Sequence, residues 1–203
     1  MSWRKAAVVV PVCLGALSLW LPWVDHPAVA LVLTGLDLPD FVRFMGAAGA
    51  PLVTPTLLAF AAPLLAAAVA GCLAVRVWSR DLWFQGLVLA GGVWLASVAF
   101  SPLERRMEFL LVGGLVAAVW LVAAWAQPWE RWVAGFALAA GAVAPALAVI
   151  QFLRAEPALS ALYGRDIAFG PGVWLAAGAS LVSVAWLVVA AARRVKQPVP
   201  QRT

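Results

Sequence analysis

The feature that most constrains the fold of this 203-residue chain is a series of long apolar runs separated by polar segments. A bilayer core about 30 Å thick requires roughly 20 apolar residues for each helix that crosses it. Runs of about that length occupy residues 6–23, 52–77, 82–100, 109–126, 132–152 and 173–192. We therefore predict an all-α fold, in which residues 1–203 form a single polytopic membrane bundle of about six transmembrane helices.

The composition excludes two other classes of protein. Hydrophobic residues make up 65% of the chain and charged residues only 11%, whereas soluble domains contain about 25% charged residues. Intrinsic disorder is excluded as well, because disordered chains lack the apolar residues that dominate here. Cys13 and Cys72 lie inside apolar runs and form no Cys-x-x-Cys motif, so we expect no disulfide framework and no paired-thiol redox chemistry.

The connections between the apolar runs differ in length. Short polar clusters separate the middle runs, at residues 78–81, 101–106 and 127–131. Two longer connections, 24–51 and 153–172, are predicted to be loops on the outer side of the membrane. The first run follows Arg4 and Lys5, as in a secretory signal, but bulky residues follow it in place of a small-x-small cleavage site. We expect it to remain as an uncleaved first helix.

The distribution of positive charge predicts the orientation of the chain, since cytoplasmic loops of membrane proteins are enriched in Lys and Arg. If the N-terminus is cytoplasmic, Lys5 and the pair Arg193 and Arg194 lie inside, and most acidic residues fall in the two outer loops. We therefore predict that both termini are cytoplasmic. The bias toward Ala, Gly, Val, Trp and Arg is typical of a GC-rich bacterial genome, so the expected location is the bacterial inner (plasma) membrane.

Small residues recur at helical spacing on two of the predicted helices. Ala137 and Gly141 are four residues apart on the fifth helix, and Ala179 and Ser183 are four apart on the sixth. Helices in lipid associate through close packing rather than by escaping water, so faces of small residues mark sites of helix contact. We predict that these four residues lie at interfaces, either within the bundle or with another membrane subunit.

The outer loop 24–51 contains a predicted short amphipathic helix that begins at Asp37. Asp37 suits the N-cap, and the carboxylate of Asp40 suits the positive end of the helix dipole. The apolar residues of this helix share one face, and they are Leu38, Phe41, Val42 and Met45. We predict that this face packs at the outer membrane interface, with docking into a groove of a partner as the alternative.

The same loop holds the residues with metal-binding or acid–base chemistry, which are Asp25, His26, Asp37 and Asp40. His26 is the only histidine, so bis-histidine haem ligation and multi-histidine zinc or di-iron sites built by this chain alone are excluded. A single histidine can still ligate one haem or chlorophyll-type ring, or join a carboxylate site. Our main expectation is a solvated loop without metal or cofactor, and a site at His26 is the alternative.

Aromatic and proline residues inside the runs leave a further alternative open. Trp94, Trp120 and Trp186 lie deep in their runs, where they either pack in the core or line a pocket for a pigment, quinone or lipid tail. Pro63 and Pro145 each remove a backbone hydrogen bond inside a predicted span. Transporters use such breaks to build sites at the membrane midplane, so this alternative predicts a cavity between the second and fifth helices.

The sequence lacks the motifs of several enzyme classes: the Gly-x-Ser-x-Gly elbow, His-Glu-x-x-His and the Walker A motif. We therefore expect a non-catalytic accessory or structural subunit of a larger inner-membrane assembly. Its expected partners are membrane lipids and other membrane subunits or a second copy, without nucleic acid and without a cofactor. Two alternatives remain, a small transporter or lipid-handling protein, and an outer-face enzyme or cofactor site around Asp25 and His26.

Overall fold

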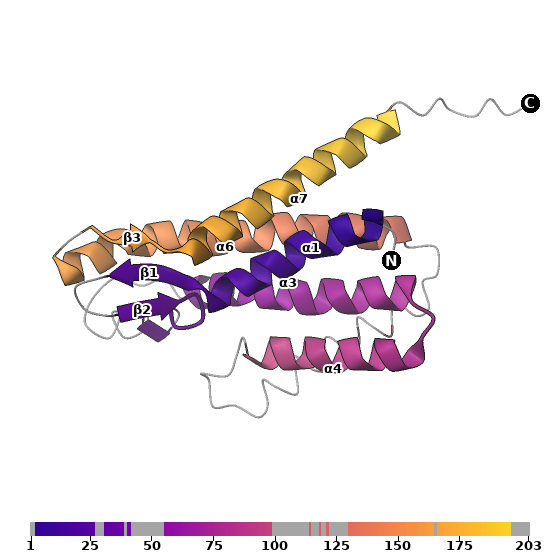
Figure 1. Ribbon diagram of the computed structural model, residues 1–203, viewed down its shortest axis with the longest axis horizontal. Coiled ribbons are helices and arrows are strands. Elements are labelled where there is room, and N and C mark those ends of the chain that lie inside the picture. The colour runs from indigo at the N-terminus through magenta and orange to yellow at the C-terminus, as the bar shows by residue number, and fades with distance from the viewer. Residues whose placement is uncertain are drawn as a thin grey trace, which may run out of the picture.

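The computed structural model describes residues 3–26, 31–38, 40–41, 55–98, 130–164 and 166–195, together with positions 114, 118 and 121. Within this part of the chain the fold is mostly helical, as predicted. The helices are α1 (Trp3–Leu17), α3 (Pro55–Trp78), α4 (Leu82–Val98), α6 (Glu130–Tyr163) and α7 (Pro171–Val195), and a short 3-10 helix, η1 (Ser18–Trp20), follows α1. Figure 1 shows α3, α4 and α6 running roughly parallel to one another, with α1 and α7 inclined to them.

Three of these helices, α3, α6 and α7, are long and apolar enough to cross a membrane. They correspond to the predicted spans 52–77, 132–152 and 173–192. Helices α1 and α4 correspond to the predicted spans 6–23 and 82–100, and both are apolar but shorter. The predicted span 109–126 lies outside the described residues except at positions 114, 118 and 121, whose backbone is helical.

Helix α6 is longer than predicted and corrects the expected loop 153–172. It continues through Pro157, so the first half of that segment is helical. Phe152 and Leu159, two turns apart, are fully buried in the core of the bundle, and this packing stabilises the additional turns. The helix is followed by Gly164, whose φ of 64° is the left-handed conformation that favours glycine after a helix C-terminus.

A small antiparallel sheet corrects the all-α prediction. It consists of β1 (Pro22–His26), β2 (Leu31–Thr34) and β3 (Ala168–Phe169), in the order β2-β1-β3. Val24 pairs with Leu33 of β2 and with Phe169 of β3. The strands come from the two segments predicted as loops, and they lie together at one end of the bundle (Figure 1). Their pairing satisfies backbone N–H and C=O groups that an irregular loop packed against the helices would leave without partners.

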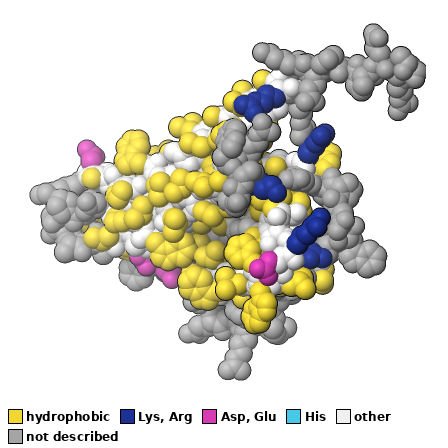
Figure 2. Space-filling model, turned by 45° about the vertical axis from the view of Figure 1, so that its right-hand side comes forward, with side chains coloured by type: hydrophobic (Ala, Val, Ile, Leu, Met, Phe, Trp, Pro, Cys, Tyr) yellow, Lys and Arg dark blue, Asp and Glu magenta, His cyan; other side chains and the backbone are white. Residues whose placement is uncertain are grey.

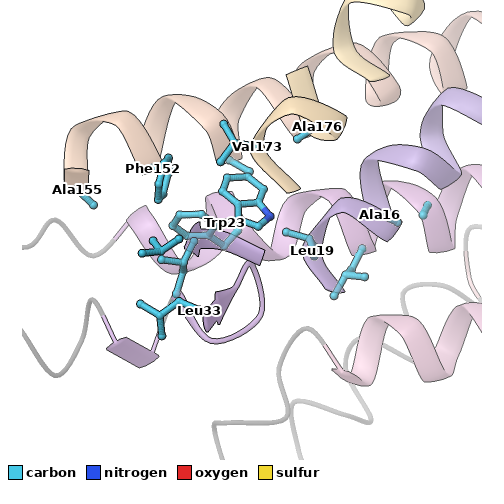
Figure 3. Close-up of a cluster of buried hydrophobic side chains, with 14 of the residues drawn as sticks. Ala16, Leu19, Trp23, Leu33, Phe152, Ala155, Val173 and Ala176 are labelled. Carbon is cyan, nitrogen blue, oxygen red and sulfur yellow. The ribbon is translucent and has the colours of Figure 1, made fainter. Parts of the chain in front are cut away.

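Trp23 lies at the centre of the buried core at this end of the bundle (Figure 3). Its side chain is fully buried, and its ring meets those of Phe60 on α3 and Phe152 on α6 edge-on, with centroids 5.7 and 5.6 Å away. The indole N–H donates a 2.8 Å hydrogen bond to the carbonyl oxygen of Ser18. A side chain at Gly172, in the first turn of α7, would collide with this ring. Trp23 therefore joins β1 to three helices.

The small residues predicted as interface positions lie between helices of the same chain. Gly141 of α6 faces α7 and α1, and a Cβ at Gly141 would lie 2.8 Å from the hydroxyl oxygen of Ser183 and 2.9 Å from a methyl carbon of Val12. Ala137 and Ala179 are buried on the same two helices. All four predicted residues therefore serve close helix packing inside the described bundle.

Candidate functional site

Asp37, one of the four residues of the predicted acidic cluster, forms hydrogen bonds with residues that are close to it in the sequence. Its carboxylate accepts hydrogen bonds from the Thr34 N–H at 3.0 Å and from the Thr34 hydroxyl at 2.6 Å. The Asp37 carbonyl oxygen accepts a hydrogen bond from the Phe41 N–H at 3.0 Å, which begins a helical turn at the predicted N-cap. Asp40 is exposed on this turn. Asp37 therefore fixes the turn between β2 and the residues that follow.

Asp25 and His26 lie in β1, where Asp25 pairs through its backbone with Val32. Their side chains fall outside the described part of the structure. Among the residues that are described, no three His, Cys, Asp or Glu side chains lie close enough together to hold a metal ion. The cofactor or metal site at His26 therefore stays a prediction.

The apolar face of the predicted amphipathic helix packs inside the chain where the structure describes it. Leu38 is fully buried in the core, and Phe41 stacks on Tyr163 at the end of α6, with ring centroids 6.3 Å apart. Burial raises the pKa of the Tyr163 hydroxyl above its ordinary value. Val42 and Met45, the other two residues of this face, lie outside the described residues.

A partly open apolar groove of about 700 Å³ lies between α1, α3 and α4. This volume lies within the roughly 300–1,000 Å³ that is typical of small-molecule sites. The α1–α3–α4 groove is bordered by Val9 and Cys13 of α1, Ala67 and Gly71 of α3, and Leu87 and Gly91 of α4. Lys5, Trp78 and Ser79 border one of its ends.

The groove exists because α1 and α4 both pack on α3, and small residues of α3 lie between them. No atom of the described residues lies within 4 Å of a Cβ built at Gly71, so the space above this position is open. The α3 side of the groove extends from Ala67 to Ser79, about 18 Å along the helix axis. This length is comparable to the depth of one leaflet of a bilayer whose apolar core is about 30 Å thick.

Polar groups are concentrated at one end of the groove. The Lys5 ammonium lies 5.5 Å from the centre of the Trp78 ring, in a cation–π arrangement. The indole N–H of Trp78 is buried and has no hydrogen-bond partner among the described residues. A buried donor without a partner costs about 1–3 kcal/mol. This end of the groove therefore combines a positive charge and an unsatisfied donor with an apolar channel.

Hydrogen bonds at the α3–α4 connection fix the same end of the groove. Arg76 donates from Nη1 to Oε1 of Gln85 at 2.8 Å, and Gln85 donates from Nε2 to the Ser79 carbonyl oxygen at 2.7 Å. The Gln85 side chain is buried. Asp81 caps α4, because its carboxylate accepts a 3.0 Å hydrogen bond from the Trp83 N–H. These polar contacts hold α3 and α4 together at the end of the groove.

A second open groove, of about 450 Å³, lies between α1, α6 and α7. It is bordered by Val8 of α1, Arg131 and Gly135 of α6, and Trp186 and Arg193 of α7. Of the three tryptophans predicted to lie deep in the chain, Trp186 therefore borders a groove. Trp94 is exposed on α4, and Trp120 is outside the described residues.

The two grooves do not lie where the sequence predicted a cavity. That cavity was expected between the second and fifth predicted helices, α3 and α6, because each contains a proline. In the structure α3 and α6 pack closely on each other, and both Pro63 and Pro145 are fully buried. The prolines are therefore accommodated in the core, and the open space lies on other faces of α3 and α6.

Charged side chains are distributed unevenly along the bundle. The described cations at the end where α1 begins and α7 ends are Lys5, Arg76, Arg80, Arg131 and Arg193. Figure 2 shows Lys and Arg side chains gathered on one side of the visible face, next to a broad hydrophobic surface. The described acidic side chains near the sheet are Asp37, Asp40, Glu156 and Asp166. Asp81 also lies at the first of these ends, and Arg154 lies at the end with the sheet. Cations therefore predominate at one end of the described bundle, the basic end, and acidic groups predominate at the other.

Sequence reasoning missed the α1–α3–α4 groove. The available signal was the succession of small residues at helical spacing on α3, including Ala67 and Gly71, but their sequence does not reveal which helices leave that face open. Searches of known protein families, of characterised proteins and of solved structures found no match to this chain.

Proposed function

We propose that this chain is a multi-pass protein of the cell inner membrane, with about six spans and both termini in the cytoplasm, that binds a membrane lipid by one acyl chain. The observation that carries the proposal is the α1–α3–α4 groove, an apolar channel of one-leaflet depth with its polar groups at one end. The corresponding role is non-catalytic lipid handling in the membrane.

The lengths of the helices and the positions of the charges support the placement in a membrane. On α6, Arg131 and Arg154 are about 35 Å apart along the helix axis, and the residues between them carry no charge. That distance slightly exceeds the apolar core of a bilayer. The basic end of the bundle is then cytoplasmic, in accordance with the positive-inside distribution, and the sheet caps the outer end.

The chemistry of the groove favours an acyl chain over a water-soluble ligand. Its sides are formed by hydrocarbon side chains such as Val9 and Leu87, and Lys5 is the one charged residue among the described residues that border it. Because the groove is partly open to the surroundings, a chain can enter it sideways from the surrounding lipid. Lipid tails are as apolar as leucine, so retention depends on how closely the groove fits the chain.

Gly71→Leu tests this proposal. A Cβ at Gly71 meets no described atom within 4 Å, and Gly71 borders the groove, so a leucine at this position extends into it. We expect the wild-type chain, extracted from phosphatidylcholine nanodiscs with mild detergent, to retain bound lipid in native mass spectra. Gly71→Leu should retain several-fold less, because its side chain occupies the position of the acyl chain.

Gly86→Leu is the matched control for this experiment. Gly86 also has open space around its Cβ, but it lies on the exposed side of α4 and does not border the groove. The control should retain as much lipid as the wild-type chain. Equal lipid retention by Gly71→Leu and Gly86→Leu would contradict the proposed function.

A second candidate function, an accessory subunit of a larger membrane assembly, is favoured by the outward face of α4. Trp83 is 89% exposed and Trp94 is 61% exposed, whereas Gln85 and Gly92 face α3 and are buried. Aromatic residues are enriched at protein interfaces. Native purification of a tagged copy at its natural expression level tests this candidate. A defined set of partner subunits would support it, and loss of those partners in Trp83→Ala would locate the contact on α4.

A further inference from the structure

Building on the proposed lipid groove, we propose that its polar end recognises the phosphate of an anionic phospholipid, through the Lys5 ammonium and the indole N–H of Trp78. The two groups approach from different helices, Lys5 from the first turns of α1 and Trp78 from the last residue of α3. They lie 5.5 Å apart, measured from the Lys5 Nζ to the centre of the Trp78 ring, and both border the groove. A lipid whose tail fills the channel therefore places its head group beside both donors.

The unsatisfied indole is the observation that points to a ligand. Buried polar groups in proteins nearly always have a hydrogen-bond partner, and the Trp78 N–H has none among the described residues. An indole N–H can donate but cannot accept, so its missing partner is an acceptor. The oxygens of a phosphate diester and of the neighbouring ester groups are acceptors of this kind.

Charge complementarity distinguishes anionic phospholipids from zwitterionic ones. No acidic residue is found among the described residues that border the groove, and Lys5 supplies a positive charge at its end. Phosphatidylcholine carries a quaternary ammonium close to its phosphate, and this second cation is repelled by Lys5. Phosphatidylglycerol carries the phosphate charge without that cation. Hydrogen bonds from a charged donor to a phosphate are roughly twice as strong as neutral ones.

The position of the two groups along their helices fits a head group. Lys5 and Trp78 lie at the basic end of the bundle, at the ends of the apolar stretches of α1 and α3. Tryptophan and lysine are characteristic of the boundary between the apolar core and the head groups. Arg80, exposed on the α3–α4 connection, adds to the positive field at this end without bordering the groove.

The test is a competition between two lipids with identical acyl chains. The full-length chain is placed in mixed micelles with equimolar phosphatidylglycerol and phosphatidylcholine, and the retained lipid is identified by native mass spectrometry. We expect the wild-type chain to prefer phosphatidylglycerol by about tenfold, which corresponds to about 1.4 kcal/mol. Lys5→Gln and Trp78→Phe should each reduce this preference several-fold while retaining phosphatidylcholine, which shows that the variants are folded and the channel is intact.

Arg80→Gln is the matched control, since it removes one positive charge from the same end without altering the border of the groove. It should keep the wild-type preference. If Arg80→Gln and Lys5→Gln reduce the preference for phosphatidylglycerol equally, the proposed contact is wrong. The preference would then come from the overall positive charge at this end of the bundle.

The possible failures of the two proposals are distinguishable. If the wild-type chain retains both lipids equally, the head-group inference is wrong and the acyl-chain groove stands. If it retains neither lipid, and a photoactivatable lipid labels no residue of the groove, both proposals are wrong. Trp78→Phe gives an independent readout, because it keeps the aromatic ring and removes only the N–H donor.

Discussion

Replacing Trp23 by alanine removes the largest fully buried side chain of the described core. A buried aromatic side chain hides about 150–250 Å², which at about 25 cal/mol per Å² gives an upper bound of about 4–6 kcal/mol. Truncation of buried Phe or Trp to alanine typically costs about 3–5 kcal/mol. Because Trp23 meets Phe60 and Phe152 on two different helices, the cavity cannot close by movement of one neighbour. We expect Trp23→Ala to destabilise the chain by about 3–5 kcal/mol.

The free energy of unfolding is measured by titrating the purified chain with sodium dodecyl sulfate in mixed micelles and following far-UV circular dichroism. Trp83→Ala is the matched control, because Trp83 is 89% exposed and its truncation opens no cavity in the described bundle. We expect this control to change the free energy of unfolding by less than about 1 kcal/mol. If Trp23→Ala costs no more than Trp83→Ala, the assignment of Trp23 as the central packing residue is wrong.

Trp23→Phe separates the hydrogen bond from the packing. Phenylalanine keeps an aromatic ring in the pocket and removes the N–H that donates to the Ser18 carbonyl oxygen. That oxygen also accepts a 3.2 Å hydrogen bond from the Leu21 N–H, so it keeps a partner in the variant. The loss from the hydrogen bond should therefore be about 0.5–1.5 kcal/mol, with a smaller additional loss from the reduced ring. A cost as large as that of Trp23→Ala would refute this division.

Three further predictions concern other parts of the fold. Gly141→Leu should destabilise the chain by about 1–3 kcal/mol, the typical cost of overpacking, because its side chain collides with α7 and α1. Gly135→Leu is the control in the same unfolding titration, because no described atom lies within 4 Å of a Cβ at Gly135. Asp37→Ala should cost about 1 kcal/mol and speed amide hydrogen exchange at Thr34, because both of that residue's hydrogen bonds to the carboxylate are lost; unchanged exchange would contradict this role. Tyr163 is the single tyrosine, so absorbance at 295 nm reports its ionisation alone, and burial should place its pKa above about 10, the value in the unfolded chain. Since the folded pKa is the higher one, the stability contributed by the neutral phenol is present below pH about 10 and falls as the pH rises through the folded pKa; coincident titrations of folded and denatured chains would refute it.

The helical part of the fold was predictable because its signals are local. The predicted span 52–77 corresponds to α3, which ends at Trp78, and the span 173–192 lies within α7. The length of an apolar run and the polar residues that end it determine such helices without reference to the rest of the chain. The cluster 78–81 was predictable for the same reason, since the carboxylate of Asp81 caps the following helix by accepting a hydrogen bond from the Trp83 N–H, two residues further along the chain.

The sheet and the extension of α6 could not be predicted in this way, because both depend on contacts between distant segments. β3 has two residues and exists through its pairing with β1 near the other end of the chain. The turns of α6 beyond the predicted span are stabilised by the burial of Phe152 and Leu159 in the core around Trp23. Tertiary packing here overrides the local loop signals of Pro157 and its charged neighbours.

The candidate site, too, was predictable from the sequence only in part. The sequence by itself determined that the chain is strongly apolar, that its long runs form helices, and that Lys5 and Trp78 end two of those runs, because composition and run length are properties of single segments. Only the tertiary structure decided that α1 and α4 leave a face of α3 open, and that Lys5 lies over the Trp78 ring. The physical reason is that packing in a helical bundle depends on which faces meet, and small residues such as Gly71 permit both a close contact and an open groove.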